Sequence, residues 1–287
     1  MAGTVNHDYH ILEPDIWPLI GSLSALTFTT GMVLFMHEMG AAHLVLGLGI
    51  AGLIATFFSW FSNIVKEAER GDHTPVVQLH MRYGMILFIA SEVMFFVAWF
   101  WGFFEFSIFA HARVGDTWDA TNPLYADALA RFKSWPPVGV ETFDPFHLPL
   151  INTLVLLLSG TTVTWAHHAL QHDDLKGAKL GLLLTLILGM GFTALQVIEY
   201  SEAGFTYDGT LYGSAFFMAT GFHGAHVVIG TIFLAVCLMR LMMGGMSAKK
   251  HLGFEFAAWY WHFVDVVWLF LFAFVYVAPY LIFEGGK

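Results

Sequence analysis

The sequence predicts an all-α polytopic membrane protein that crosses the bilayer seven times. Of its 287 residues, 57% are hydrophobic and 12% are charged, whereas about 25% of the residues of a soluble domain are charged. Six stretches of 18 or more residues contain no Asp, Glu, Lys or Arg, and they cover 16–37, 39–65, 145–172, 180–198, 209–239 and 266–283. A helix of about 20 such residues crosses the hydrocarbon core and satisfies its own backbone polar groups there.

The seven predicted spans follow one another along nearly the whole chain. They cover 16–36, 41–65, 79–107, 149–170, 179–202, 213–243 and 255–282. The third span is included despite Glu92 and Glu105, and the seventh despite Asp265, because the residues around these carboxyl groups are almost all apolar. The sequence lacks the regular apolar and polar alternation that a β-barrel would require.

Small residues indicate how the first two spans pack. The second span has them at every fourth position, at Gly47, Ala51, Ala55 and Ser59, and the first span has Gly21 and Ala25. Such a face lets membrane helices approach closely. We therefore expect spans one and two to form a hairpin that packs along this face.

Lysine and arginine residues predict the orientation, because they favour the inner ends of membrane helices. Eight of the 12 fall on the side of the N-terminus: Lys66, Arg70, Arg82, Lys176, Lys179, Arg240, Lys249 and Lys250. We therefore expect the N-terminus inside and the C-terminus outside. The longest loop, about 108–148, then lies outside, and its turn-forming residues with Trp135, Pro136 and Pro137 predict an ordered segment.

Carboxyl groups within the spans and near their ends include Glu92, Glu105 and Glu199. Glu92 falls about 20 Å along the third span, near the membrane midplane, and no cation shares its helix face. We expect this midmembrane carboxyl to be neutral. It either faces lipid or aromatic side chains or forms a hydrogen bond to a neighbouring helix. Glu105 and Glu199 lie toward the outer ends of their spans, where we expect both to reach the interface and stay charged.

Histidines in spans six and seven repeat one spacing. His223 and His226 stand three residues apart, as do His262 and Asp265. Imidazole ligates haem and metals, so these residues are candidates for a haem or metal site, a proton relay or an interhelical hydrogen-bond network. We favour the structural network, because a metal site of this size needs further convergent ligands, and we assign no metal site and no catalytic residue.

The inner surface carries a second group of candidates. Trp60, Lys66, Glu67, Arg70 and His73 cluster after span two, and Arg240 ends span six. Basic and aromatic residues at this level attract phospholipid head groups. The ordinary excess of positive charge on the inner side would also produce most of this pattern. No basic cluster suited to nucleic acid occurs in the chain.

Four long segments resemble subunit III of the haem–copper cytochrome c oxidases. They are HTPVVQLHMRYGMILFIASEVMFFVAWFW from His73, PLINTLVLLLSGTTVTWAHH from Pro149, YGSAFFMATGFHGAHVVIGTIFL from Tyr212 and GFEFAAWYWHFVDVVWLFLF from Gly253. The similarity covers nearly the whole chain, and the four segments occur in the family's order. The number of predicted spans also matches.

The resemblance implies a non-catalytic core subunit of a proton-pumping oxidase that passes electrons from cytochrome c to O2. It implies a V-shaped bundle, with a two-helix hairpin at 1–66 and a five-helix bundle at 67–287, and phospholipid bound in the cleft. The family's lipid-binding positions correspond here to Trp60, Glu67, His73 and Arg240, and its midmembrane glutamate to Glu92. Haem and copper are expected only in partner subunits I and II, with structural phospholipids as the only groups that this chain binds.

The leading hypothesis is a subunit that packs against subunit I and supports proton uptake. His10, Asp72, His73, Asp173 and Asp174 could collect protons on the inner side. The alternatives are subunit III of a quinol oxidase, a stand-alone transporter, which would need broken helices, and a membrane haem protein. The single cysteine, Cys237, excludes a two-cysteine copper site. The expected location is a bacterial plasma membrane, with the N-terminus cytoplasmic and the C-terminus periplasmic, rather than the mitochondrial inner membrane.

Overall fold

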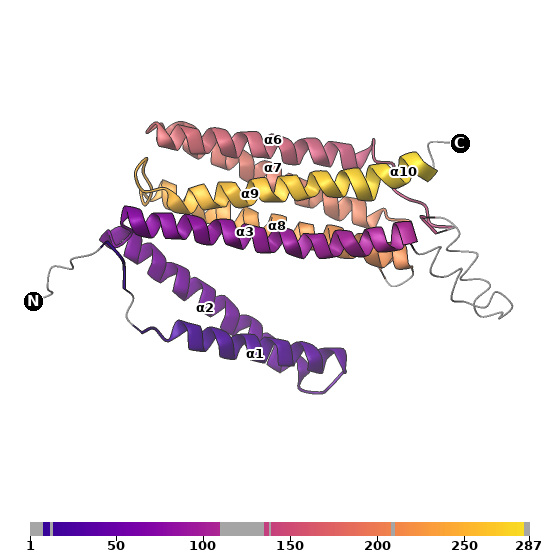
Figure 1. Cartoon of the computed structure of the whole chain (residues 1–287), viewed down its shortest axis with the longest axis horizontal. Helices are drawn as coiled ribbons and strands as arrows, with labels where there is room; N and C mark the ends of the chain where they lie inside the picture. Colours follow the sequence, from indigo (N-terminus) through magenta and orange to yellow (C-terminus); the bar gives the residue numbers. More distant parts are fainter. Residues whose placement is uncertain (1–7, 12–13, 110–134, 138, 208–209, 284–287) are drawn as a thin grey trace, which may run out of the picture. The chain divides into compact units, whose positions relative to one another are not determined.

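The computed structural model describes residues 8–11, 14–109, 135–137, 139–207 and 210–283. Every named element among them is helical (Figure 1). The elements are α1 (Trp17–Met36), α2 (Ala42–Arg70), α3 (Pro75–Phe104), η1 (Glu105–Phe109), α6 (Leu148–Gln171), α7 (Leu175–Ser201), α8 (Leu211–Met242), α9 (Leu252–Leu271), η2 (Phe272–Val277) and α10 (Ala278–Phe283). The two η segments are π-helical.

The prediction of seven membrane spans is confirmed for the described residues. Seven helical segments there are long and apolar enough to cross a bilayer. The third runs through η1 to Phe109, and the seventh runs from α9 through η2 into α10. Most of the predicted ordered loop at 108–148 lies outside the described residues.

The chain divides into two compact units, Met1–Gly84 and Met85–Lys287. Each unit is described by itself below. The predicted division at residues 66 and 67 and the predicted V shape stay predictions.

The hairpin of α1 and α2 is confirmed in the first unit, and Gly21 of α1 lies close to Thr56 of α2. The predicted packing face of α2 is wrong. A Cβ atom on Gly31 would lie 2.5 Å from the Cα of Leu46, and one on Gly49 would collide with the backbone of Phe28. Gly47 is exposed and has no neighbour within 4 Å of such an atom. Two residues along a helix correspond to a rotation of about 200°, so Gly49 and Gly47 lie on opposite faces.

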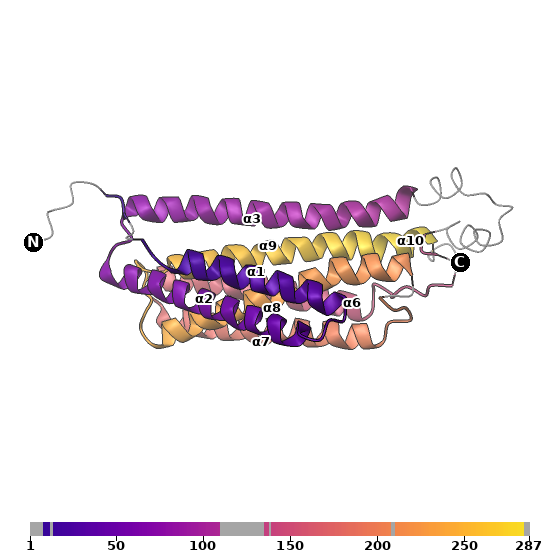
Figure 2. The same cartoon turned by 90° about the horizontal axis from the view of Figure 1, so that it is seen from below.

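The second unit is a bundle in which α6, α7, α8 and α9 lie side by side (Figures 1 and 2). Its core is aromatic, and Trp261 and Trp268 of α9 are its largest fully buried side chains. The ring of Trp261 fits between Gly189 of α7 and Gly230 of α8, where a Cβ atom would lie 2.7 Å and 2.9 Å from it. Glycine at these two positions therefore makes room for a tryptophan at the centre of the bundle.

Candidate functional site

Glu92 forms a polar contact with a histidine from another helix. Its Oε2 atom lies 2.9 Å from Nε2 of His226 on α8. The other ring nitrogen of His226, Nδ1, lies 2.6 Å from the carbonyl oxygen of Phe222 and must donate to it. Nε2 therefore either accepts a proton from a neutral Glu92 or donates one to the carboxylate. Because both arrangements have no net charge, the pair suits a low-dielectric environment.

Aromatic rings enclose this pair on the His226 side. Phe96 lies with its ring centroid 4.9 Å from that of His226, and Phe95, Tyr260 and Phe263 lie within 6.3 Å. A hydrogen bond from Glu92 to a neighbouring helix, one of the two expected arrangements, is therefore present, and aromatic rings surround its partner. The third span alone does not identify this partner, since His226 is 134 residues away in the sequence.

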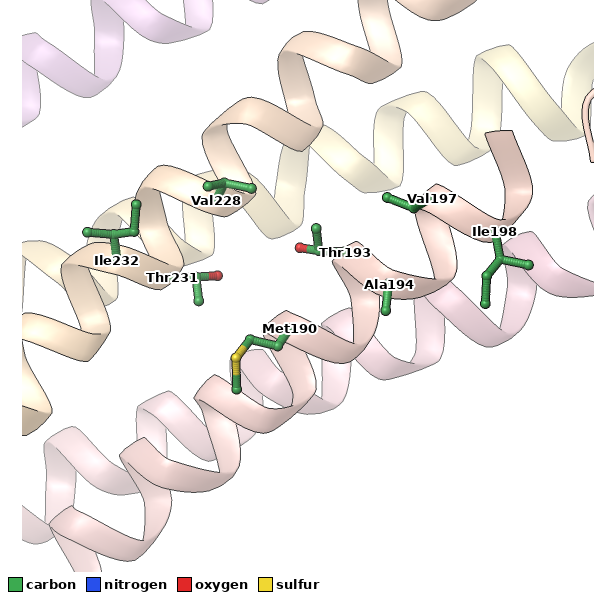
Figure 3. A pocket seen from close by; sticks show the side chains of 8 residues that line it. All are labelled: Met190, Thr193, Ala194, Val197, Ile198, Val228, Thr231 and Ile232. Carbon is green, nitrogen blue, oxygen red and sulfur yellow. The ribbon is translucent and has the colours of Figure 1, made fainter. Parts of the chain in front are cut away.

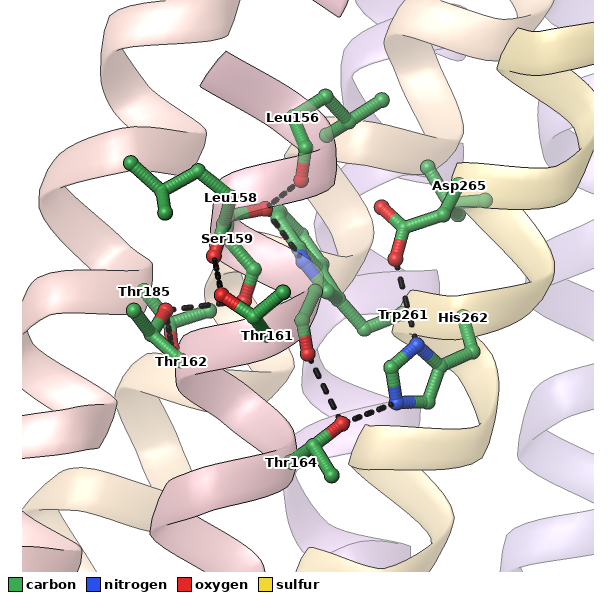
Figure 4. A network of polar contacts seen from close by, with 12 residues as sticks. Leu156, Leu158, Ser159, Thr161, Thr162, Thr164, Thr185, Trp261, His262 and Asp265 are labelled. Atoms are coloured by element: carbon green, nitrogen blue, oxygen red, sulfur yellow. Dashed lines mark hydrogen bonds and ion pairs between the residues drawn. The ribbon is translucent and has the colours of Figure 1, made fainter. Parts of the chain in front are cut away.

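His262 and Asp265 form a second polar contact, which Thr164 of α6 extends (Figure 4). His262 Nδ1 lies 3.3 Å from Asp265 Oδ2, and His262 Nε2 lies 3.0 Å from Thr164 Oγ1. The Thr164 hydroxyl donates to the Gly160 carbonyl at 2.9 Å, so its oxygen accepts from His262. Asp265 is buried, whereas 44% of the His262 side chain is exposed within a membrane span.

His223 makes a third, separate contact. It is buried, and its Nε2 donates to the carbonyl oxygen of Val264 at 3.2 Å. Its ring packs against those of Phe192 and Trp268. The four residues predicted as one polar network thus lie in three different contacts. Among the described residues, no three His, Cys, Asp or Glu side chains are grouped so that they could hold a metal ion.

Tryptophan side chains add direct bonds between α9 and α6. Trp261 donates from Nε1 to Ser159 Oγ at 2.9 Å (Figure 4), and Trp268 donates to Thr153 Oγ1 at the same distance. Such bonds between membrane helices hold buried polar groups in pairs. In the sequence, both tryptophans resemble ordinary apolar core residues. Their hydrogen bonds to α6 could therefore not be predicted from the sequence.

A buried polar cluster near the end of α7 was not predicted. Glu199 is 1% exposed and accepts a hydrogen bond from the Tyr276 hydroxyl of η2 at 2.6 Å. Gln196, one turn earlier, accepts a hydrogen bond from the side-chain amide of Asn152 on α6 at 3.2 Å. The expectation that Glu199 reaches the interface is wrong, because its face of α7 packs against η2 rather than facing outward.

In the first unit, Glu67 faces two histidines. Its Oε2 atom lies 3.8 Å from Nε2 of both His10 and His73, and only 11% of the His73 side chain is exposed. Burial lowers the pKa of His73, the charge of Glu67 opposes this, and His10 lowers the pKa further. The Thr74 hydroxyl donates to the Asp8 carbonyl and fixes this N-terminal segment beside the cluster.

The predicted head-group residues lie in different surroundings. Lys66, Glu69 and Arg70 line an open cavity of about 500 Å³ at the end of α2. Trp60 is 42% exposed earlier on the same helix. Glu67 and His73 instead face each other, as described above. Arg240 belongs to the second unit, where it lies in the last turn of α8 and its carbonyl accepts a bond from Gly245.

An apolar groove of about 510 Å³ lies between α7 and α8 (Figure 3). Its lining residues are Met190, Thr193, Ala194, Val197, Ile198, Val228, Thr231 and Ile232. Both threonine hydroxyls donate to carbonyls of their own helices, at Gly189 and Val227. The lining therefore behaves as an apolar surface.

Curated proteins from plants and vertebrates are similar to this chain. "Cytochrome c oxidase subunit 3" of Triticum aestivum is 47% identical over 277 residues, which cover 96% of this chain and 98% of the relative. The protein of the same name from Xenopus laevis is 47% identical over 94% of this chain and 96% of the relative. That from Danio rerio is 48% identical over 94% and 97%.

These relatives contradict the expected bacterial plasma membrane. They come from wheat, Arabidopsis, a frog and a fish, which favours the mitochondrial inner membrane. The expectation was wrong because it had little physical support: the distribution of lysine and arginine orders the two faces of a membrane but does not identify the membrane.

A family model also matches the chain. The model described as "Cytochrome c oxidase subunit III" matches residues 7–130 and 128–280. The two matches together include all seven spans except the last residue of the seventh. The relatives agree with this model over nearly the full length of both sequences. The chain therefore belongs to the cytochrome c oxidase subunit III family.

Proposed function

We propose that this oxidase subunit acts without a redox centre of its own, by supporting proton uptake, binding phospholipid and packing against subunit I. Haem and copper would then lie in subunits I and II. The observation that carries the proposal is the cluster of His10, Glu67 and His73 at the N-terminal side of the first unit. It places two imidazoles against one carboxylate, close to where two membrane helices end.

The cluster has the chemistry of a proton-collecting surface. Imidazole is the side chain whose charge changes most readily near neutral pH. The lowered pKa of His73 leaves its ring neutral at pH 7 and able to accept a proton. Glu67 stabilises the protonated form of either histidine. The cluster can therefore take a proton from water and release it to a neighbouring acceptor.

Other residues proposed for this surface differ in their surroundings. Asp72 lies 3.6 Å from Arg70. Asp174 caps α7, because its carboxylate accepts a hydrogen bond from the backbone nitrogen of Gly177. This carboxylate therefore stabilises the start of the helix. Asp173 is exposed and has a left-handed backbone with φ of 59°. Of these residues, His10 and His73 are the strongest candidates.

Steady-state oxygen consumption of the intact oxidase tests the proton proposal. The double variant His10→Gln/His73→Gln should retain wild-type turnover at acidic pH and lose turnover severalfold at alkaline pH, where proton supply limits the reaction. His37→Gln/His43→Gln is the matched control, because both histidines are exposed at the opposite end of the α1–α2 hairpin. If the turnover of the first variant had the same pH dependence as that of the wild type, the proposal would be contradicted.

Two surfaces support phospholipid binding. Lys66 and Arg70 stand one turn apart beside the open cavity, so both cations can contact one phosphate. Trp60 lies at the level where aromatic residues meet the head groups. In the second unit, the groove of Figure 3 is apolar and free of unsatisfied hydroxyls, as an acyl chain requires.

Native mass spectrometry of the intact oxidase tests lipid binding. The variant Lys66→Gln/Arg70→Gln should lose at least one phospholipid that the wild type retains. Lys249→Gln/Lys250→Gln removes two exposed cations on the same side of the membrane and should retain it. Equal lipid content in the two variants would show that these cations hold no lipid.

Exposed surface in the spans supports packing against a partner. Among the described residues of α1 and α2, only Gly31, Ala42, Gly49 and Thr56 are buried. In the second unit, His262 is an ionisable side chain that is 44% exposed within a span, and such residues in membrane spans usually face protein rather than lipid. We therefore assign the face with His262 to subunit I. His262→Leu should weaken retention of this subunit in the purified oxidase, whereas Ile187→Ala at an exposed position of α7 should not.

A further inference from the structure

The cluster around Glu199 forms one directed chain of hydrogen bonds. Asn152 Nδ2 donates to Gln196 Oε1 at 3.2 Å, Gln196 Nε2 donates to the Tyr276 hydroxyl oxygen at 3.5 Å, and that hydroxyl donates to Glu199 Oε1 at 2.6 Å. Three elements, α6, α7 and η2, supply the four residues. All are buried in the second unit.

The amides orient the phenol. Because Gln196 donates into the Tyr276 oxygen, the hydrogen of Tyr276 must point elsewhere, and Glu199 is its acceptor. Amide hydrogens are held tightly, so the exchangeable protons of the cluster are those of the phenol and of the carboxyl group. Tyr276 lies in π-helical η2, a kind of segment that often occurs at functional sites.

Two acceptor atoms in the cluster lack donors. Glu199 Oε2 and Asn152 Oδ1 have no hydrogen-bond partner among the described residues, although their side chains are 1% and 0% exposed. Within the residues that the structure describes, no lysine, arginine or histidine forms an ion pair with Glu199. The ionisable groups that face it are Tyr276 and Tyr200, and the Tyr200 hydroxyl donates to Thr220.

An ionised Glu199 would be a buried anion with one hydrogen-bond donor and no cation, which is a costly arrangement. A proton on Oε2 removes the charge and turns an acceptor without a partner into a donor. We propose that Glu199 is a buried proton-binding site, in which the carboxyl group holds one proton and Tyr276 stabilises its other oxygen. This site lies at the opposite end of α7 from Asp174 and is independent of the proton-collecting histidines.

Infrared spectroscopy of the intact oxidase at neutral pH tests the proposal. Glu199→Gln should remove one carbonyl band of a protonated carboxylic acid, a band that shifts when the sample is transferred to D2O. Glu202→Gln is the matched control, because Glu202 is exposed just beyond the same helix. It should leave the band unchanged.

Tyr276→Phe keeps the carboxyl group and removes its donor, so it tests the site even if Glu199→Gln prevents assembly. The same band should move to higher frequency, because the carbonyl loses a hydrogen bond. The proposal is overturned if the band survives in Glu199→Gln, or if Tyr276→Phe leaves every protonated carboxyl band in place. The first result would mean that Glu199 carries no proton at neutral pH, and the second that Tyr276 does not stabilise a protonated Glu199.

Discussion

Alanine at Gly49 should weaken the α1–α2 hairpin, whereas alanine at Gly47 should not. The added methyl group at Gly49 meets the backbone of Phe28, which cannot move without shifting α1. At Gly47 the same group meets nothing within 4 Å. Both substitutions remove a glycine from a helix and gain the same helix propensity, about 1 kcal/mol. The difference between them therefore isolates the packing contact.

The size of this difference follows from the cost of overpacking. Forcing an extra methyl group into a closely packed contact costs about 1–3 kcal/mol. Local opening of the hairpin should then become roughly five- to 150-fold more frequent in Gly49→Ala than in Gly47→Ala. Hydrogen exchange of the α1 and α2 amides in the intact oxidase, followed by mass spectrometry, measures this ratio. Equal exchange in the two variants, or faster exchange in Gly47→Ala, would refute the assigned packing face.

Three further predictions concern buried polar groups. Thr153→Val should leave the Trp268 indole without its acceptor and lower the free energy of unfolding of the subunit by about 1–3 kcal/mol, measured by chemical denaturation in detergent. A double-mutant cycle with Glu92→Gln and His226→Gln should give a coupling free energy of about 0.5–2 kcal/mol in the same assay. The folded chain should lose stability as the pH falls below about 6.5, because the lowered pKa of His73 makes the unfolded chain bind more protons. His73→Gln should reduce this loss, which for one proton cannot exceed about 1.4 kcal/mol per pH unit.

A specific experimental result would contradict each of these three predictions. A Thr153→Val variant as stable as the exposed-site variant Thr29→Val would show that the indole finds another acceptor. Additive effects of the Glu92 and His226 substitutions would show that the two side chains act independently. An acid sensitivity that is the same with and without His73 would assign it to other groups.

The number and limits of the spans were predictable because they depend on composition alone. A stretch of 18 or more residues without charge must cross the membrane or be buried, whatever its neighbours are. The hairpin of α1 and α2 followed from small residues in consecutive spans. The packing face did not, since α2 has glycines on opposite sides and a single sequence cannot tell which side meets α1.

The polar contacts were harder to predict because they join distant segments. Glu92 and His226 were both singled out, yet their pairing depends on how α3 and α8 are arranged. The predicted environment of Glu199 was wrong for a related reason: its position near a helix end predicts exposure, whereas it is buried in the bundle against Tyr276 of η2. Tyr276 carries the matching hydroxyl group, but in the sequence it is one aromatic residue among many.

Removing this subunit from the intact oxidase tests the central claim most directly. The subunit can be released with detergent, and the haem absorbance of both fractions and the oxygen consumption of the remaining complex can be measured. We predict that all haem absorbance stays with the remaining subunits and that turnover falls most strongly at alkaline pH. Haem absorbance that leaves with this subunit, or turnover that is unchanged at every pH, would contradict the account.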